Sequence, residues 1–93
     1  MTFGQRLREL RKAKGMTQRE LAEKTGISFA YVSKLETGVM PPPRQKIILA
    51  LAKTLGANNA VTDELFGLAK KMPSDLLKHV DTQVIEMLRS LQH

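Results

Sequence analysis

Apolar residues recur at helical spacing along the chain. Phe3, Leu7 and Leu10 follow one another at intervals of four and three, and Thr2 and Gly15 mark the ends of the helix that this spacing predicts. The same reasoning, with capping residues, glycines and a proline as boundaries, predicts an all-α fold of five helices. Their expected ranges are residues 3–14, 18–24, 29–37, 45–55 and 63–72, with a further helical stretch after Ser74. Thr62 is the expected N-cap of the fifth helix.

The segment from Met16 to Gly38 predicts two short helices joined by a tight turn. Thr17 is a good N-cap, and Glu20 three residues later completes a capping box. Gly26 stands where a helix end needs a residue that tolerates a left-handed backbone, and Ser28 caps the next helix. Two helices joined in this way form a helix-turn-helix unit, whose second helix enters the major groove of DNA.

The outward face of the second helix in this unit favours contact with DNA. Val32 and Leu35 are expected to face inward, because they stand three residues apart on one side of the helix. The residues left on the outside are small or mixed in character and carry no carboxylate: Phe29, Ala30, Ser33, Lys34 and Thr37. A helix face that only meets solvent would more often carry glutamate.

These motifs resemble the phage repressor/Cro-like (XRE-type) helix-turn-helix DNA-binding family. The resemblance rests on Thr17-Gln18-Arg19-Glu20-Leu21-Ala22, Gly26-Ile27-Ser28, Val32-Ser33-Lys34-Leu35-Glu36-Thr37-Gly38, Pro41-Pro42-Pro43 and the segment 48–56. It covers roughly residues 2–56. It implies a repressor-like helix-turn-helix domain over residues 1–60, followed by a C-terminal helical extension over residues 61–93.

The resemblance also implies which side chains read base pairs. Phe29, Ala30 and Lys34 fall at base-reading positions, and Ser28 and Ser33 are close enough to share the work. Lys34 can donate to guanine O6 and N7, while Phe29 and Ala30 offer apolar contact to a thymine methyl group. Phe29 departs from the polar side chains common at its position, so packing against a neighbour or a partner subunit is an alternative.

Other residues are expected at the DNA backbone. By the resemblance, Gln18 binds a phosphate and braces the second helix, Thr37 contacts a phosphate, and Arg44 lies beside the backbone or in the minor groove. Thr17 has the N–H groups of a helix N-terminus beside it, which attract phosphate. Tyr31 has two open roles, since its hydroxyl could donate to a phosphate or its ring could cover the edge of the core.

The resemblance further implies a structural ion pair between Arg11 and Glu36. It would tie the first helix to the end of the DNA-reading helix. Glu36 is the one acidic residue between positions 28 and 44, so a carboxylate there needs a neutralising partner. Removal of either member would leave an unpaired charge.

Positive charge is concentrated in the first part of the chain. Residues 1–56 hold eleven Lys/Arg and four Asp/Glu, a net +7, whereas residues 57–93 hold four and five, a net −1. This asymmetry points to double-stranded DNA as the partner of the first part. A need for solubility would explain the total charge but not its distribution.

An apolar stripe marks the C-terminal stretch: Leu77, Val80, Val84, Ile85, Leu88 and Leu91. The stripe is expected to cover an apolar surface, either the core of its own domain or the same helix in a second copy. We favour a homodimer, because one helix-turn-helix unit reads too few bases to be selective alone. An alternative function is an antitoxin or adaptor-type interaction module, in which these helices bind a toxin or another regulator.

Enzymatic, metal-binding and membrane functions find no support in the sequence. There is no cysteine, no paired carboxylate motif, no Ser-His constellation and no Gly-rich phosphate loop, so neither a cofactor nor a metal is expected. His79 and His93 are isolated. No apolar run reaches the length of about 18 residues that a membrane span needs, so a cytoplasmic location is expected. The sequence therefore predicts a DNA-binding transcription regulator, most plausibly a repressor on a near-palindromic operator.

Overall fold

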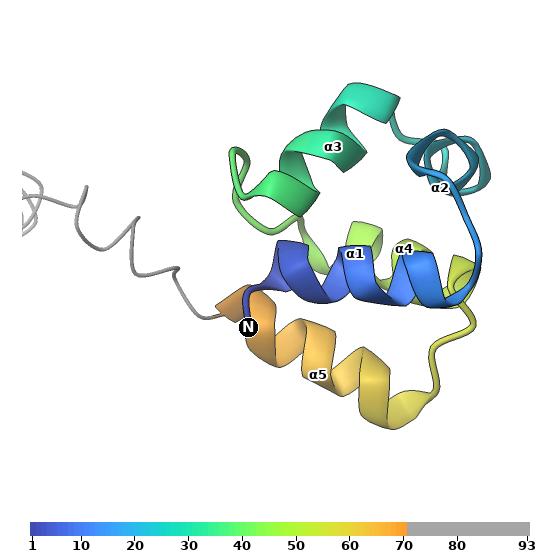
Figure 1. Cartoon of the computed structure of the whole chain (residues 1–93). Coiled ribbons are helices and arrows are strands. Elements are labelled where there is room, and N and C mark those ends of the chain that lie inside the picture. Colours follow the sequence, from blue (N-terminus) through green and yellow to red (C-terminus); the bar gives the residue numbers. More distant parts are fainter. Residues whose placement is uncertain (71–93) are drawn as a thin grey trace, which may run out of the picture.

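This computed structural model describes residues 1–70, which contain five helices joined by short connecting segments (Figure 1). The predicted all-α fold is confirmed, and the first four helices agree with their predicted bounds to within one residue. The longest of the five has 12 residues, and within this part of the chain no helix is long and apolar enough to cross a membrane. The helices are α1 (Phe3–Ala13), α2 (Gln18–Thr25), α3 (Phe29–Thr37), α4 (Gln45–Thr54) and α5 (Asn59–Lys70).

The starts of α1, α2 and α3 are fixed by the capping residues that the sequence indicates. Thr2 and Thr17 each form a complete capping box with the residue three positions later. The hydroxyl oxygen of Ser28 accepts a hydrogen bond from the backbone N–H of Tyr31 at 3.1 Å. Each cap satisfies backbone donors that a helix end leaves open, so these starts are determined by local sequence.

The start of α5 differs from the prediction. The helix begins at Asn59, and the side-chain oxygen of Asn58 accepts from the backbone N–H of Val61 at 2.9 Å. Thr62, which the sequence suggests as the cap, instead donates its hydroxyl to the carbonyl of Asn58 at 2.8 Å. Asparagine caps a helix about as well as threonine, and inside a helix a threonine hydroxyl turns back to the preceding turn. The prediction that Thr62 caps this helix is therefore wrong.

A single hydrophobic core receives side chains from all five helices. α1 packs against α3 and against α5, and α4 packs against α2 and α5 (Figure 1). Leu65 of α5 is fully buried, so the core includes residues on both sides of position 60, where the boundary between the two parts of the chain was expected. The buried apolar side chains are Phe3, Leu7, Met16, Leu21, Ala22, Val32, Leu35, Ile48, Leu51, Ala52, Leu55 and Leu65.

Arg6 adds a polar link between α1 and α5 at the surface. Its Nε donates to Oε1 of Glu64 at 2.9 Å, and its Nη1 donates to Oε1 of Glu9 at 2.6 Å. The hydrogen bond that Arg6 donates to Glu64 raises the pKa of Arg6. Because the three side chains meet solvent, each pair contributes at most about 1 kcal/mol. The position of α5 therefore depends mainly on apolar packing, by the buried Leu65 and by Phe66, Leu68 and Ala69 against the core.

Gly4 allows α1 to approach the backbone of α3 closely. A Cβ atom at this position would lie 2.2 Å from the carbonyl oxygen of Leu35 and 2.8 Å from that of Glu36. Both contacts are to backbone atoms, which cannot move aside as a flexible side chain can. The absence of a side chain at Gly4 thus sets the distance between α1 and the C-terminal end of α3.

Several predictions concern residues 71–93, outside the described part of the chain. They include the predicted end of the fifth helix near Met72, the helical stretch after Ser74 and the apolar stripe between Leu77 and Leu91.

Candidate nucleic-acid interface

α2, α3 and the turn between them form a helix-turn-helix unit. Gly26 takes the left-handed backbone conformation, with φ of 74°, and its N–H donates to the carbonyl of Ala22 at 2.9 Å. The next N–H, of Ile27, reaches the same carbonyl at 3.1 Å. Ala22 is buried, and a small residue there suits two helices that cross. At the far end of α3, Gly38 has φ of 81° and closes the helix.

The side chains predicted to read bases lie along the outer side of α3. Phe29, Ala30 and Lys34 are exposed, and Ser33 is partly exposed. Ser28 is exposed as well, but its hydroxyl oxygen already accepts the capping hydrogen bond that starts α3. Val32 and Leu35 are buried on the opposite side, as predicted. The structure therefore places the five predicted residues along α3, from its N-cap to its last turn, away from the side that buries Val32 and Leu35.

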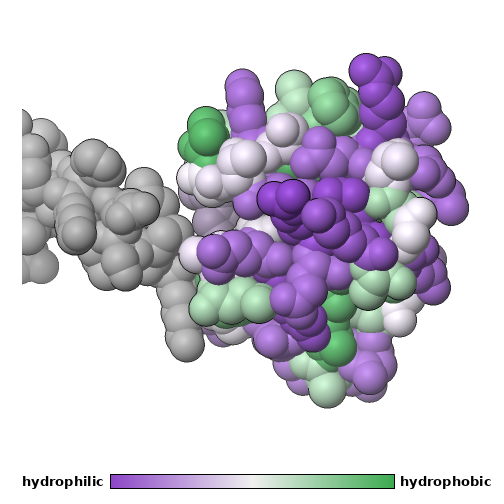
Figure 2. Space-filling model, in the orientation of Figure 1, coloured by the Kyte–Doolittle hydropathy of each residue, from purple (hydrophilic) through white to green (hydrophobic). Residues whose placement is uncertain are grey.

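Hydrophilic side chains cover much of the face that includes this unit. Figure 2 shows them gathered near the centre of the face, over α1 and toward α2 and α3. Two carboxylates of the unit are already engaged, since Glu20 belongs to a capping box and Glu36 is buried. A hydrogen bond from the backbone N–H of Thr17 lowers the pKa of Glu20. Within α3 itself the carboxylate of Glu36 is buried, so the exposed face of this helix carries the cation of Lys34 and no exposed carboxylate.

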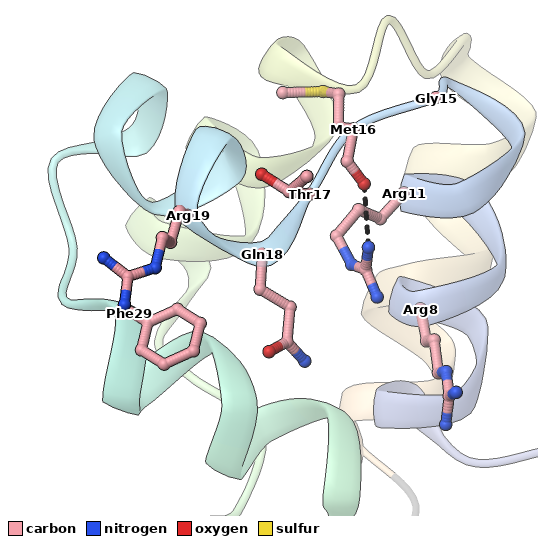
Figure 3. A pocket seen from close by; sticks show the side chains of 8 residues that line it. All are labelled: Arg8, Arg11, Gly15, Met16, Thr17, Gln18, Arg19 and Phe29. Atoms are coloured by element: carbon pink, nitrogen blue, oxygen red, sulfur yellow. Dashed lines mark hydrogen bonds between the residues drawn. The ribbon is translucent and has the colours of Figure 1, made fainter.

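Arg11 and Glu36 form the ion pair that the resemblance implies. Nε of Arg11 donates to Oε2 of Glu36 at 2.7 Å, and Nη2 donates to Oε1 at 3.0 Å, so the contact is bidentate. Both residues are buried. Nη1 of Arg11 donates in addition to the carbonyl of Met16 at 2.7 Å (Figure 3). The pair therefore connects α1, the segment before α2 and the end of α3.

Gln18 completes this network. Its Nε2 donates to Oε1 of Glu36 at 3.1 Å. The amide thus braces α3 against the N-terminus of α2, which is one of the two roles implied by the resemblance. The side chain of Gln18 is partly exposed.

The other residues predicted at the DNA backbone lie around the unit. Thr17 and Thr37 are exposed, and the hydroxyl of Thr37 donates back to the carbonyl of Ser33 at 3.1 Å. Tyr31 is partly buried against the core, so its ring does cover the core edge. Arg44 is the N-cap of α4 and is exposed, with no side-chain capping bond of its own.

An open hollow of about 580 Å³ lies between the N-terminus of α2 and the side chains of α1 and α3 (Figure 3). The guanidinium groups of Arg8, Arg11 and Arg19 belong to residues that line it. Arg11 is paired with Glu36, whereas Arg8 and Arg19 form no ion pair within residues 1–70. The positive charges of Arg8 and Arg19 beside a helix N-terminus suit an anionic group such as phosphate. Its full lining comprises Arg8, Arg11, Gly15, Met16, Thr17, Gln18, Arg19 and Phe29.

Arg19 is a residue of this site that the sequence did not single out. Its guanidinium carbon lies 4.9 Å from the centroid of the Phe29 ring, within the range of a cation–π contact. Figure 3 shows the two side chains together, one from the start of α2 and one from the start of α3. The sequence places a phenylalanine at the first position of α3. No spacing rule relates Phe29 to Arg19, because the two residues belong to different helices.

The fold and this surface define a helix-turn-helix protein. The model of the helix-turn-helix family matches residues 7–58, more than half of the chain, and the chain belongs to this family of DNA-binding transcriptional regulators. The predicted family is thereby confirmed. Membership in a family of regulators also confirms the prediction that the chain is not an enzyme.

Two curated relatives come from Bacillus subtilis (strain 168). The HTH-type transcriptional regulator RghRB is 47% identical over 53 residues, which cover 57% of this chain and 38% of that protein. The HTH-type transcriptional regulator ImmR is 33% identical over 92 residues, which cover 96% of this chain and 69% of that protein. The chain thus spans less than half the length of RghRB but more than two thirds of ImmR.

Solved structures agree on the fold. The crystal structure of SinR, the master regulator for biofilm formation, in complex with DNA has a TM-score of 0.63 and 29% identity, covering 70% of this chain and 98% of that one. A SinR protein/SinI protein complex also gives a TM-score of 0.63, at 23% identity, covering 98% of this chain and 79% of that one. At that lower identity the second comparison shows the fold alone.

Proposed function

We propose that the chain is a sequence-specific repressor that occupies double-stranded operator DNA in the cytoplasm as a two-fold homodimer. The observation that carries this proposal is the exposed, carboxylate-free face of α3, held beside an arginine-lined hollow at the N-terminus of α2. The SinR–DNA structure, with its similar fold, supports DNA as the ligand.

Two kinds of contact have separate tasks in this proposal. Gln18, Thr17 and Thr37 meet phosphates and set the register of α3 in the major groove, because phosphate contacts position a protein without reading sequence. Tyr31 and Arg44 extend the backbone contacts on either side. The side chains of Ser28, Ala30, Ser33 and Lys34 then face base edges, with Lys34 directed to guanine O6 and N7.

Residues 1–60 form the DNA-binding part in this proposal, and residues 61–93 extend it toward a second copy of the chain. A two-fold dimer would set two α3 helices about 34 Å apart, which matches one turn of B-DNA. An operator for such a dimer has nearly palindromic half-sites. Occupancy of promoter DNA then represses transcription by excluding other proteins.

Selection of bound sites from random duplex DNA tests the proposal directly. We expect an enriched consensus with two-fold symmetry and half-sites about 10 base pairs apart, together with a binding constant that falls steeply with salt. Sedimentation of the free protein measures its oligomeric state independently. An asymmetric consensus bound by a monomer would refute the homodimer, and a pool with no enriched sequence would refute sequence-specific binding altogether.

A further inference from the structure

Phe29 is a large apolar side chain in an exposed position. It is 44% exposed, so the hydrophobic core does not hold its ring. The guanidinium carbon of Arg19 lies over this ring, 4.9 Å from the ring centroid. The two residues are the second of α2 and the first of α3, and both line the hollow at the start of α2.

A guanidinium stacked on a ring keeps its hydrogen-bond donors available. Stacking uses the flat face of the group, while the N–H donors lie in its plane and match the oxygens of a phosphate in a bidentate contact. Within residues 1–70, the ion pairs involve Arg6 and Arg11, not Arg19. The cation of Arg19 is therefore oriented by an aromatic ring and is not neutralised by a carboxylate among the described residues.

We infer that the Phe29 ring is a platform that holds the guanidinium of Arg19 against a DNA phosphate at the edge of the reading helix. Arg19 is then a phosphate-contacting residue and Phe29 a positioning residue, and not a reader of thymine. This inference rests on the proposed function, and it replaces the apolar base contact considered for Phe29 from the sequence.

The position of Arg19 favours phosphate over a base edge as its ligand. In a helix-turn-helix unit the first helix crosses the DNA backbone while the second enters the groove, and Arg19 belongs to the first. It also lines the same hollow as Arg8 and the backbone of Thr17, at the positive end of α2. All of these groups attract an anion, and none of them distinguishes one base pair from another.

The test compares four variants of the full chain: Arg19→Ala, Phe29→Leu, the double variant and Lys53→Ala. Leucine at position 29 keeps an apolar side chain but removes the aromatic face. Lys53→Ala removes one positive charge from an exposed position in the last turn of α4, at the opposite end of that helix from Arg44, and is the matched charge control. Affinity is measured by fluorescence anisotropy at several salt concentrations, on the selected consensus duplex and on single-base variants of it.

Arg19→Ala should weaken binding to every duplex alike and reduce the salt slope by about one. Phe29→Leu should weaken binding about two- to fivefold, also without regard to sequence, as expected for loss of an exposed cation–π contact. The double variant should bind no more weakly than Arg19→Ala alone, because the ring acts through the arginine. Lys53→Ala should leave affinity and salt slope unchanged.

Two results would overturn the inference while leaving the proposed function in place. One is wild-type affinity in Arg19→Ala when the wild-type protein binds its consensus. The other is a loss in Phe29→Leu at a single base position that persists in the Arg19→Ala background, since the ring would then read a base directly. A wild-type protein that binds no duplex refutes the proposed function itself. Nuclear magnetic resonance of the free protein checks the platform without DNA, because ring-current shifts of the Arg19 side-chain protons should vanish in Phe29→Leu.

Discussion

The carboxylate of Glu36 receives three hydrogen bonds in a buried position, and Glu36→Ala removes all of them. Two come from Nε and Nη2 of Arg11, at 2.7 and 3.0 Å, and one comes from Nε2 of Gln18, at 3.1 Å. After the substitution, the buried guanidinium of Arg11 would retain only the carbonyl of Met16 among these partners. A charge would then remain in the interior without its counter-charge.

The expected cost is large relative to the stability of a small domain. Removal of one member of a buried pair typically costs about 3–5 kcal/mol, because the remaining charge is desolvated and unpaired. Domains of this size are stable by about 5–15 kcal/mol in total. At about 4–8 °C per kcal/mol, the melting temperature should fall by on the order of 10–40 °C. The DNA affinity of Glu36→Ala should fall as well, because the end of α3 loses its link to α1.

Thermal and urea unfolding followed by circular dichroism would measure this change. The control replaces both members, Arg11→Met with Glu36→Leu, and should recover most of the lost stability because an apolar pair of similar volume leaves no buried charge. The reasoning would be refuted if Glu36→Ala kept both the wild-type melting temperature and the wild-type affinity for DNA.

Three further substitutions address the helix contact, the reading face and a cap. Gly4→Ala should lower the unfolding free energy by about 1–3 kcal/mol in urea titrations, because the added Cβ meets the backbone of α3. Gly67→Ala, which has open space around it, should raise the unfolding free energy by about 0.5–1 kcal/mol. Equal effects of the two substitutions would contradict the close approach of α1 to α3. Lys34→Ala should lose about 1–3 kcal/mol of discrimination at one base pair in binding assays, and uniform weakening on all duplexes would instead make Lys34 a phosphate contact. The low pKa of Glu20, set by the Thr17 N–H, means that its stabilising contribution is complete above its ordinary pKa and is lost as the pH falls through the folded-state pKa. Between about pH 6 and about pH 3, Glu20→Gln should therefore lose less unfolding free energy than the wild type, and parallel stability curves would argue against this cap.

Most of the fold could be predicted because its signals are local. The caps at Thr17 and Ser28 and the left-handed glycines at 26 and 38 each act within one helical turn, so neighbouring residues suffice to locate them. The start of α5 was less determined, since Asn58 and Thr62 are both good caps four residues apart. Both residues satisfy the local rules for a cap, so local sequence does not choose between them, and the structure has Asn58 as the cap.

The close contacts between helices could not be predicted from spacing. From sequence alone, a glycine inside a helix such as Gly4 is expected only to destabilise that helix. The structure is needed to show that a side chain at this position would meet the backbone of α3. The stacking of Arg19 on Phe29 depends on the angle between α2 and α3, which no pattern within either helix determines. The Arg11–Glu36 pair was anticipated through family resemblance, since 25 positions separate the two residues in the chain.

The guanidinium of Arg11 has a consequence for how the molecule opens. It joins α3, through Glu36, and the chain before α2, through the Met16 carbonyl, to α1 at one point. Partial detachment of α3 would have to break this junction, so amide hydrogen exchange in α1 and α3 should proceed through one shared event, not by separate fraying. The orientation of α3 is thus fixed in the free protein, so little ordering entropy would remain to be lost if α3 binds DNA as proposed.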